Sequence, residues 1–168
     1  MNKLKIGIIS ALALAGSMPA KAQFKIVNPV PQNIQSTGFA QLPQSVNLKT
    51  SNNRGNSIAV AALKNSLTAN PKAKFTITLG IKGDKCVKAY AKHLPQKAEG
   101  YWLNISDKGA VIIGNDEEGL FYGVQTLLGS IAKGKLEKGT VTDWPDVDFR
   151  GTVEGFYGTP WSHEARLS

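Results

Sequence analysis

The 168-residue sequence is 42% hydrophobic and 19% charged, with 17 glycines, 8 prolines and a single cysteine. This composition is that of a folded globular protein, and it excludes a disordered chain, a collagen-like chain and a small disulfide-stapled domain. The length suits one domain of roughly 100 to 150 residues with flanking segments, but it leaves no room for a barrel of roughly 250 residues as well.

The formal net charge of +8 is unevenly distributed. Residues 24–108 contain 12 Lys and Arg against 3 Asp and Glu, whereas residues 109–168 contain 5 against 9. A basic half could attract a polyanion such as nucleic acid or an acidic polysaccharide. Its lysines, however, are spread along predicted helices and loops, without the interleaved aromatic residues on which bases stack. We therefore expect a solvated lysine-bearing surface and no nucleic-acid partner.

Residues 1–22 have the three parts of a secretory signal peptide. A basic start, Met1–Lys5, precedes an apolar run, Ile6–Gly16, and an Ala-x-Ala cleavage site ends at Ala22. The apolar run is shorter than the roughly 20 residues that span a bilayer. We expect cleavage after Ala22, a periplasmic or secreted protein, and no membrane association after cleavage.

Residues 23–146 are predicted to form one domain that begins with little regular structure. Prolines interrupt segment 24–50, so only short extended pieces are expected there, at Phe24–Val27 and Ser45–Leu48. A turn over Asn52–Asn56 is followed by apolar residues at helical spacing, which predict a first helix over Ser57–Leu67.

The middle of the domain alternates strands with one short helix. Lys74–Leu79 has the alternation of a half-buried strand, and a short helix is expected over Lys85–Lys92, before a Leu-Pro pair that disfavours helix. Tyr101–Ser106 and Ala110–Gly114 flank a three-residue loop that ends in glycine, which predicts a β-hairpin.

A second long helix is predicted to begin at Asn115, as the N-cap of a capping box with Glu118, and to end at Gly134. Its Gly119 and Gly123 are expected to let a strand approach closely rather than to pair helices in a membrane. A short extended piece at 140–142 and a boundary at 143–146 close the domain. Strands mixed with packed helices predict a two-layer α+β fold.

Residues 147–168 differ from what precedes them. Phe149–Val153 is predicted to be a strand, the loop after it carries a carboxylate and aromatic residues, and Ser162 is expected to cap a helix. This order is one β/α unit, and in barrels built from such units the chemistry lies at the carboxyl ends of the strands. A lone parallel strand has no partner, so we expect the rest of this second domain to lie outside the 168 residues.

Other motifs are incomplete. Gly114–Gly119 has glycines at P-loop spacing but is followed by Leu-Phe instead of Lys-Ser/Thr, and His163-Glu164 lacks the second histidine of a zinc helix because Leu167 occupies its position. We expect no metal and no cofactor. The lone Cys86 is interpreted as a packing residue, with a reactive thiol as the alternative.

The loop after residue 153 has the composition of a sugar site. Glu154 lies beside Phe156, Tyr157 and Trp161, and aromatic faces stack on pyranose rings while acids and amides bind hydroxyls. Alternatively, Glu154 pairs with Arg150 or caps backbone amides. No second carboxylate stands at catalytic spacing, so a complete acid/base pair is absent from these residues.

The run 150–163, Arg-Gly-Thr-Val-Glu-Gly-Phe-Tyr-Gly-Thr-Pro-Trp-Ser-His, closely resembles the opening of the catalytic barrel of glycoside hydrolase family 84. That family contains β-N-acetylglucosaminidases, including bacterial O-GlcNAcases and enzymes named hyaluronidases. Segments 99–101, 114–117 and 144–145 resemble the α+β domain that precedes the barrel in families 84 and 20. The resemblance implies a hexosaminidase-type domain 2 followed by the first β/α unit of a truncated TIM barrel.

The resemblance also implies a mechanism and a binding partner. In the family, the 2-acetamido oxygen of the substrate attacks the anomeric carbon in a retaining hydrolysis. Two neighbouring aspartates on a later strand assist this attack, and that strand is absent here, so no catalytic residue and no activity of these residues alone are expected. Gly155, Phe156 and Tyr157 match the sugar-binding rim and Glu154 a structural support, which implies glycans or glycoproteins containing N-acetylglucosamine as partners. A non-catalytic glycan-binding or interaction domain is the alternative. Neither the oligomeric state nor the specific glycan follows from the sequence.

Overall fold

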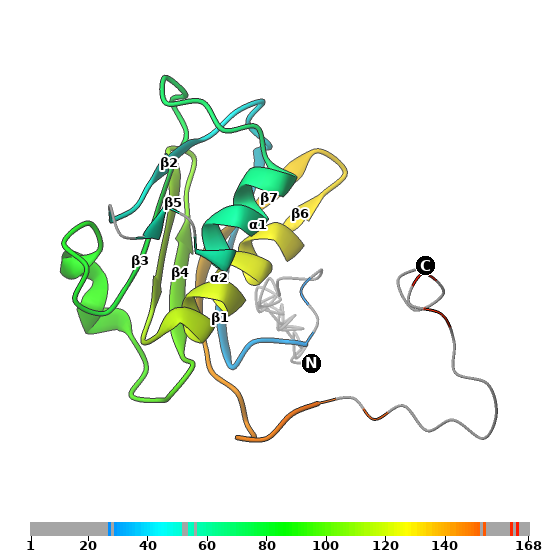
Figure 1. The fold of residues 1–168 in the computed structure, drawn as a ribbon. Helices are drawn as coiled ribbons and strands as arrows, with labels where there is room; N and C mark the ends of the chain where they lie inside the picture. The colour runs from blue at the N-terminus through cyan, green and yellow to red at the C-terminus, as the bar shows by residue number, and fades with distance from the viewer. Residues whose placement is uncertain are drawn as a thin grey trace, which may run out of the picture.

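The computed structural model describes residues 27, 29–51, 54–55, 57–151, 153, 162 and 164. Its centre is a mixed sheet with the strand order β1-β7-β4-β5-β3-β2, to which β6 adds by pairing with β7. Two helices, α1 and α2, lie on one face of this sheet (Figure 1). The predicted two-layer α+β fold is confirmed.

The described part of the chain contains ten helices and strands. In chain order they are β1 (Asn33–Gln41), β2 (Asn47–Lys49), α1 (Ile58–Ser66), β3 (Thr76–Ile81), the 3-10 helix η2 (Lys88–His93), β4 (Tyr101–Ile105), β5 (Gly109–Gly114), α2 (Glu117–Gly129), β6 (Ile131–Ala132) and β7 (Lys135–Asp143). β3 runs parallel to both of its neighbours, whereas β4 is antiparallel to β5 and β7, and β1 is antiparallel to β7.

The two faces of the sheet bury different amounts of apolar surface. Between the sheet and the two helices lies the main core, which includes Leu63, Ile77, Leu79, Leu103, Ile112, Leu120, Val124, Leu127 and Val141. On the other face, η2 and the residues around it cover a smaller cluster of Val87, Leu94, Trp102 and Ile113. Tyr90 and His93 both stack on the Trp102 ring in this second cluster. The main core accounts for most of the stabilising burial.

Several predicted elements are confirmed. α1 begins as expected, with the Ser57 side chain accepting a hydrogen bond from the Val60 amide. β4 and β5 form the predicted hairpin, and β3 lies two residues later than the predicted strand. Gly123 lets α2 approach the sheet, since a Cβ there would lie 2.6 Å from Cγ2 of Ile112 and 3.0 Å from the Tyr101 ring.

The prediction of a strand-poor lead-in over 24–50 was wrong for β1. This nine-residue edge strand alternates half-buried with exposed residues, because successive side chains point to opposite faces of the sheet, and five of its nine residues are Asn, Gln, Ser or Thr. Its register with β7 shifts between Ser36 and Gly38, and Gly38 has a φ of 111°. Glycine is also required opposite, since a Cβ on Gly139 would lie 2.0 Å from the Gln35 carbonyl oxygen.

The predicted end of the second long helix was wrong by five residues. α2 ends at Gly129, and the segment after it turns back as a β6–β7 hairpin. Lys133 and Gly134 both have positive φ, 49° and 72°, as a two-residue type I′ turn requires. β7 therefore begins at Lys135 instead of residue 140.

Two further expectations need correction. The helix predicted over 85–92 is a 3-10 helix that starts at Lys88, and Cys86 lies in the turn before it. Within Phe149–Val153, where a barrel strand was predicted, the described residues 149–151 and 153 lie in no strand of this structure. A strand needs a neighbouring strand to satisfy its backbone groups, and none pairs with these residues.

Candidate functional site

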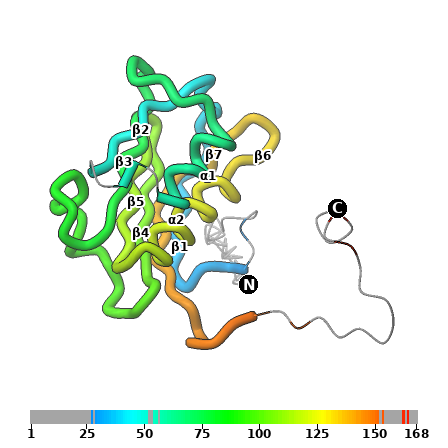
Figure 2. The backbone as a smooth tube through the Cα atoms, in the orientation of Figure 1, coloured from blue at the N-terminus to red at the C-terminus, as the bar shows by residue number. Residues whose placement is uncertain are grey.

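The described part of the candidate site is the end of the sheet from which the chain leaves towards the predicted sugar-binding loop. Strand register defines this end, because Tyr101 pairs with Gly114 on one side and with Asp143 on the other. β1 begins beside it, with Asn33 opposite Thr142. We call it the exit end, because the described residues that follow β7 continue from it (Figure 2).

A turn at residues 95–100 is fastened to the start of α2. The N-cap of α2 is Asp116, one residue after the predicted one: one carboxylate oxygen accepts from the Gly119 amide at 2.8 Å and the other from the Glu99 amide at 2.8 Å. Asn115 instead donates its side-chain amide to the carbonyls of Pro95 and Lys97, at 2.7 and 2.6 Å. These bonds hold Glu99 in the left-handed region, at a φ of 56°.

A buried tyrosine connects three elements just behind this turn. Tyr101 is only 1% exposed. Its hydroxyl oxygen lies 2.5 Å from Oγ1 of Thr126 on α2, and the hydroxyl donates a hydrogen bond to the Asp143 carboxylate at 3.2 Å. Burial raises the pKa of the Tyr101 phenol, and the nearby Asp143 charge raises it further, against the opposing effect of the Thr126 hydrogen bond. The last residue of β7 is thereby held against β4 and α2.

An ion-pair cluster ties α1 to the same end. Arg54, just before α1, bonds Asp84 at 2.5 Å through Nε and Glu117 of α2 through Nη1. Burial alone would raise the pKa of Asp84, but the Ile81 amide and Arg54 outweigh it, so this pKa lies below its ordinary value. The cluster joins the carboxyl end of β3 to both helix starts.

Beyond β7, the chain is held by Arg150. Its guanidinium donates to the Glu99 carboxylate, to the Tyr122 hydroxyl at 3.1 Å and to the Val147 carbonyl at 2.6 Å. The guanidinium carbon also lies 5.7 Å from the centre of the Tyr122 ring. Hydrogen bonds to Glu99 and Tyr122 raise the pKa of Arg150 above its ordinary value. Nearby, Gln32 binds Asp143 and Asp146, at 3.0 and 2.5 Å.

The predicted sugar-binding residues Gly155, Phe156 and Tyr157 lie outside the described residues, as do Glu154 and the predicted signal peptide at 1–22. The structure does bring together the three segments whose sequence resembled the family, 99–101, 114–117 and 144–145, at or beside the exit end. Sequence reasoning paired Arg150 with Glu154 as one alternative; in the structure Arg150 pairs with Glu99. Sequence patterns gave no indication of that pair, because the partners are 51 positions apart.

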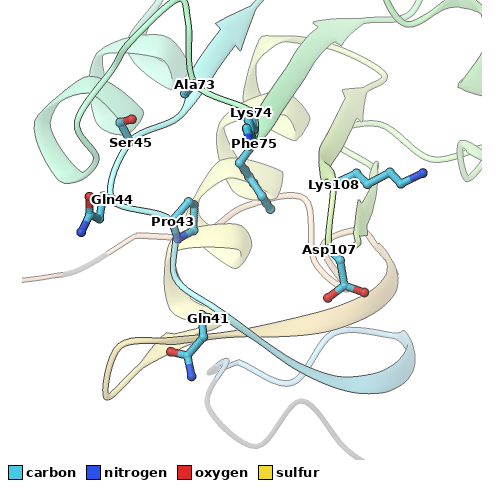
Figure 3. Close-up of a pocket in the computed structure, with 9 residues that line it drawn as sticks. All are labelled: Gln41, Pro43, Gln44, Ser45, Ala73, Lys74, Phe75, Asp107 and Lys108. Carbon is cyan, nitrogen blue, oxygen red and sulfur yellow. The ribbon is translucent and has the colours of Figure 1, made fainter.

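An open depression lies at the opposite end of the sheet (Figure 3). It has a volume of about 560 Å³ and is lined by Gln41, Pro43, Gln44, Ser45, Ala73, Lys74, Phe75, Asp107 and Lys108. Phe75, its one aromatic residue, is only 8% exposed, and both carboxylate oxygens of Asp107 bond Lys138 at 2.9 Å. Lys108 points away from Phe75 and Pro43. The depression therefore lacks an exposed aromatic face for a sugar ring.

Cys86 is a half-buried free thiol that packs against the smaller apolar cluster and donates to the Leu79 carbonyl at 3.6 Å. These contacts fit the packing role expected from the sequence. Among the described residues, no helix is both long and apolar enough to cross a membrane, and no three His, Cys, Asp or Glu residues gather as metal ligands.

Comparison with known proteins shows the family to which this chain belongs. Residues 25–144 match the family model "Glycosyl hydrolase family 20, domain 2", and residues 150–168 match the model "beta-N-acetylglucosaminidase". The chain belongs to the glycosyl hydrolase family 20 domain 2 family. The domain 2 match ends one residue after β7, so it covers the whole sheet and both helices.

Relatives and solved structures agree with this assignment. Beta-hexosaminidase of Vibrio vulnificus is 38% identical over 58 residues, which are 33% of this chain and 7% of that protein. Probable alpha-glucuronidase A of Aspergillus fumigatus is 30% identical over 81 residues, 41% of this chain and 9% of that protein. The structure of CpGH84B has a TM-score of 0.68 and 31% identity, over 84% of this chain and 26% of that one. Domain 2 of this chain is thus related to the hexosaminidases of families 20 and 84, and it spans a minor part of these proteins' length.

Proposed function

We propose that this chain is the amino-terminal part of an exported glycoside hydrolase that removes β-linked N-acetylglucosamine by substrate-assisted, retaining hydrolysis. The observation that carries the proposal is the succession of two matches: a domain 2 over residues 25–144, followed after five residues by the β-N-acetylglucosaminidase match at 150–168. Within the family 84 group, O-GlcNAcase and hyaluronidase-like substrates both contain this sugar.

In this proposal, domain 2 supports the active site and does not form it. Residues 147–168 are the first β/α unit of a TIM barrel, with Gly155, Phe156 and Tyr157 lining the sugar subsite and Glu154 supporting the loop. The acetamido group of the substrate supplies the nucleophile, and aspartates on a later barrel strand polarise it and move the proton. The 168 residues by themselves are expected to be inactive because they lack that aspartate pair.

Export is the second part of the proposal. The basic start, apolar run and Ala-x-Ala site of residues 1–22 support cleavage after Ala22. Sequencing the amino terminus of the protein recovered from the periplasm or the medium tests it, and the expected first residue is Gln23. Recovery from the cytoplasm with Met1 in place would contradict export.

The activity is tested with nitrophenyl glycosides. The product of the complete reading frame, including any codons beyond Ser168, should release nitrophenol from nitrophenyl N-acetylglucosaminide, and not from nitrophenyl glucoside, which lacks the acetamido nucleophile. A trifluoroacetamido substrate should react more slowly, because fluorine withdraws electrons from the attacking oxygen. Equal rates on the glucoside would contradict the substrate-assisted mechanism. Clear turnover by the pure 168-residue chain would contradict the supporting role of these residues.

The match to an alpha-glucuronidase favours a second candidate. It indicates that domain 2 occurs beside active sites of another specificity, as a glycan-binding or interaction domain would. Binding of N-acetylglucosamine oligosaccharides to the 168-residue chain, without hydrolysis by the complete product, would support this alternative.

A further inference from the structure

We propose that Arg150 is a positioning residue: its guanidinium clamps the segment before the predicted sugar-binding loop onto domain 2, so that domain 2 fixes where the loop begins. This inference rests on the proposed function for its effect on catalysis. The clamp itself consists of Arg150, Glu99, Tyr122 and the Val147 carbonyl.

The acceptors of the clamp are themselves held in place. Glu99 has a left-handed backbone, and the Asp116 carboxylate binds its amide at 2.8 Å. Asp116 is in turn the N-cap of α2, the helix that carries Tyr122. One helix, α2, therefore holds the backbones of both acceptor residues, because its N-cap binds the Glu99 amide and the helix itself carries Tyr122.

A guanidinium is suited to this task. It presents several donors in one plane, so it can bind a carboxylate, a hydroxyl and a carbonyl at once while its face contacts the Tyr122 ring. A lysine ammonium keeps the charge but cannot reproduce this planar set of bonds. The bond to Val147 also closes a turn within the segment itself, because Val147 precedes Arg150 by three residues.

The anchor lies close to the loop along the chain. Gly155 is five positions after Arg150, so it lies at most about 18 Å from Arg150 even in a fully extended chain. Without the clamp, the last side-chain hydrogen bond before the loop among the described residues up to 151 is that of Gln32 to Asp146. The exposed side chains between them, Val147 at 56% and Phe149 at 96%, bury little that could hold the segment. The clamp thus limits the conformations from which the sugar subsite must be assembled.

The existence of the clamp is tested in the 168-residue chain by heteronuclear NOE measurements on the backbone amides of Val147, Phe149 and Gly151. We expect values near those of the sheet in the wild type, clearly lower values in Arg150→Gln and Glu99→Gln, and intermediate values in Arg150→Lys. Asp148→Asn is the matched control, since Asp148 forms no hydrogen bond with the described part of the chain, and it should leave the values unchanged. Wild-type amides as mobile as those of Arg150→Gln would overturn the proposal.

The consequence for catalysis is tested in the product of the complete reading frame. Arg150→Gln should raise KM for nitrophenyl N-acetylglucosaminide by about tenfold, with a smaller change in kcat and the same melting temperature. The reversed pair Glu99→Arg with Arg150→Glu should recover part of that loss. An unchanged KM in an active enzyme would overturn the positioning role alone. If the wild type hydrolyses nothing, the proposed function fails, while the NOE values still decide whether the clamp exists.

Discussion

At the scale of single residues, the exit end is built from polar groups that are buried and paired. Tyr101 and Asp84 differ in how they contribute, since one is neutral and the other charged at neutral pH. Sequence patterns do not predict these hydrogen bonds, because the partners of Tyr101 and Asp84 are 25 and 30 positions away in the chain. Their roles can be separated by mutation and by pH.

Tyr101→Phe should lower the free energy of unfolding by about 1 to 2 kcal/mol, because it leaves the buried Thr126 hydroxyl without its partner while the ring is kept. The raised pKa of Tyr101 means that its contribution is complete below the unfolded value of about 10 and is lost as the pH rises beyond it. Urea titrations at pH 7 and above pH 10 measure both effects. Tyr90→Phe, which keeps the ring stacked on Trp102, should change neither. Equal alkaline losses in Tyr101→Phe and wild type would contradict this assignment.

Asp84→Asn should cost about 1 to 3 kcal/mol at pH 7, because it removes the charge that faces Arg54 in a pair only 11% and 12% exposed. Since the pKa of Asp84 is lowered in the folded state, its contribution is present above the unfolded value of about 3.9 and fades as the pH falls through the folded value. The difference in the free energy of unfolding between Asp84→Asn and wild type should therefore become smaller in acid. Asp107→Asn, which breaks an ion pair whose carboxylate is 72% exposed, should cost under about 1 kcal/mol. Similar costs for both variants would contradict the distinction.

At the scale of elements, α2 is positioned by close backbone contacts. A Cβ on Gly119 would lie 2.5 Å from the Gly100 carbonyl oxygen, a backbone atom held by its own bond from the Asn115 amide at 2.8 Å. Glycine is required at residue 119 because a side chain has no space there, and not because of its φ, which lies outside the left-handed range. The start of α2 thereby rests directly on the turn that carries Glu99.

Gly119→Ala should destabilise the domain by about 1 to 3 kcal/mol, even though alanine favours helix by about 1 kcal/mol over glycine. Gly129→Ala, at the other end of the same helix, would bring its Cβ only to 3.7 Å from Val27. It should be neutral or slightly stabilising. Thermal melts of the two variants measure the difference, and equal melting temperatures would contradict the packing account.

The sequence predicted the apolar elements well and the polar ones poorly. Ser57 and the periodicity after it located α1, and the glycine-bearing loop located the β4–β5 hairpin. β1 was missed because an edge strand of Asn, Gln, Ser and Thr has no apolar run, and the end of α2 was missed because Ile131 fits the helical spacing although Lys133-Gly134 forms a hairpin turn. At the site, the family-like segments were identified, but the Glu99–Arg150 pair depends on tertiary structure.

At the scale of the whole molecule, the two ends of the sheet have different functions in this account. The exit end gathers the starts of both helices, the ion-pair cluster and the clamp, and it leads to the predicted sugar-binding loop. At the opposite end, the described residues line an open depression without an exposed aromatic face. A sugar should therefore bind beyond the exit end and not in the depression.

A crystal structure of the complete gene product with bound N-acetylglucosamine tests this account most directly. We predict that the sugar contacts Gly155, Phe156 and Tyr157, that residues 147–153 lie outside the domain 2 sheet, and that Arg150 still binds Glu99. A sugar bound among Gln41, Lys74 and Lys108, or residues 147–153 paired as one more strand of the domain 2 sheet, would contradict it.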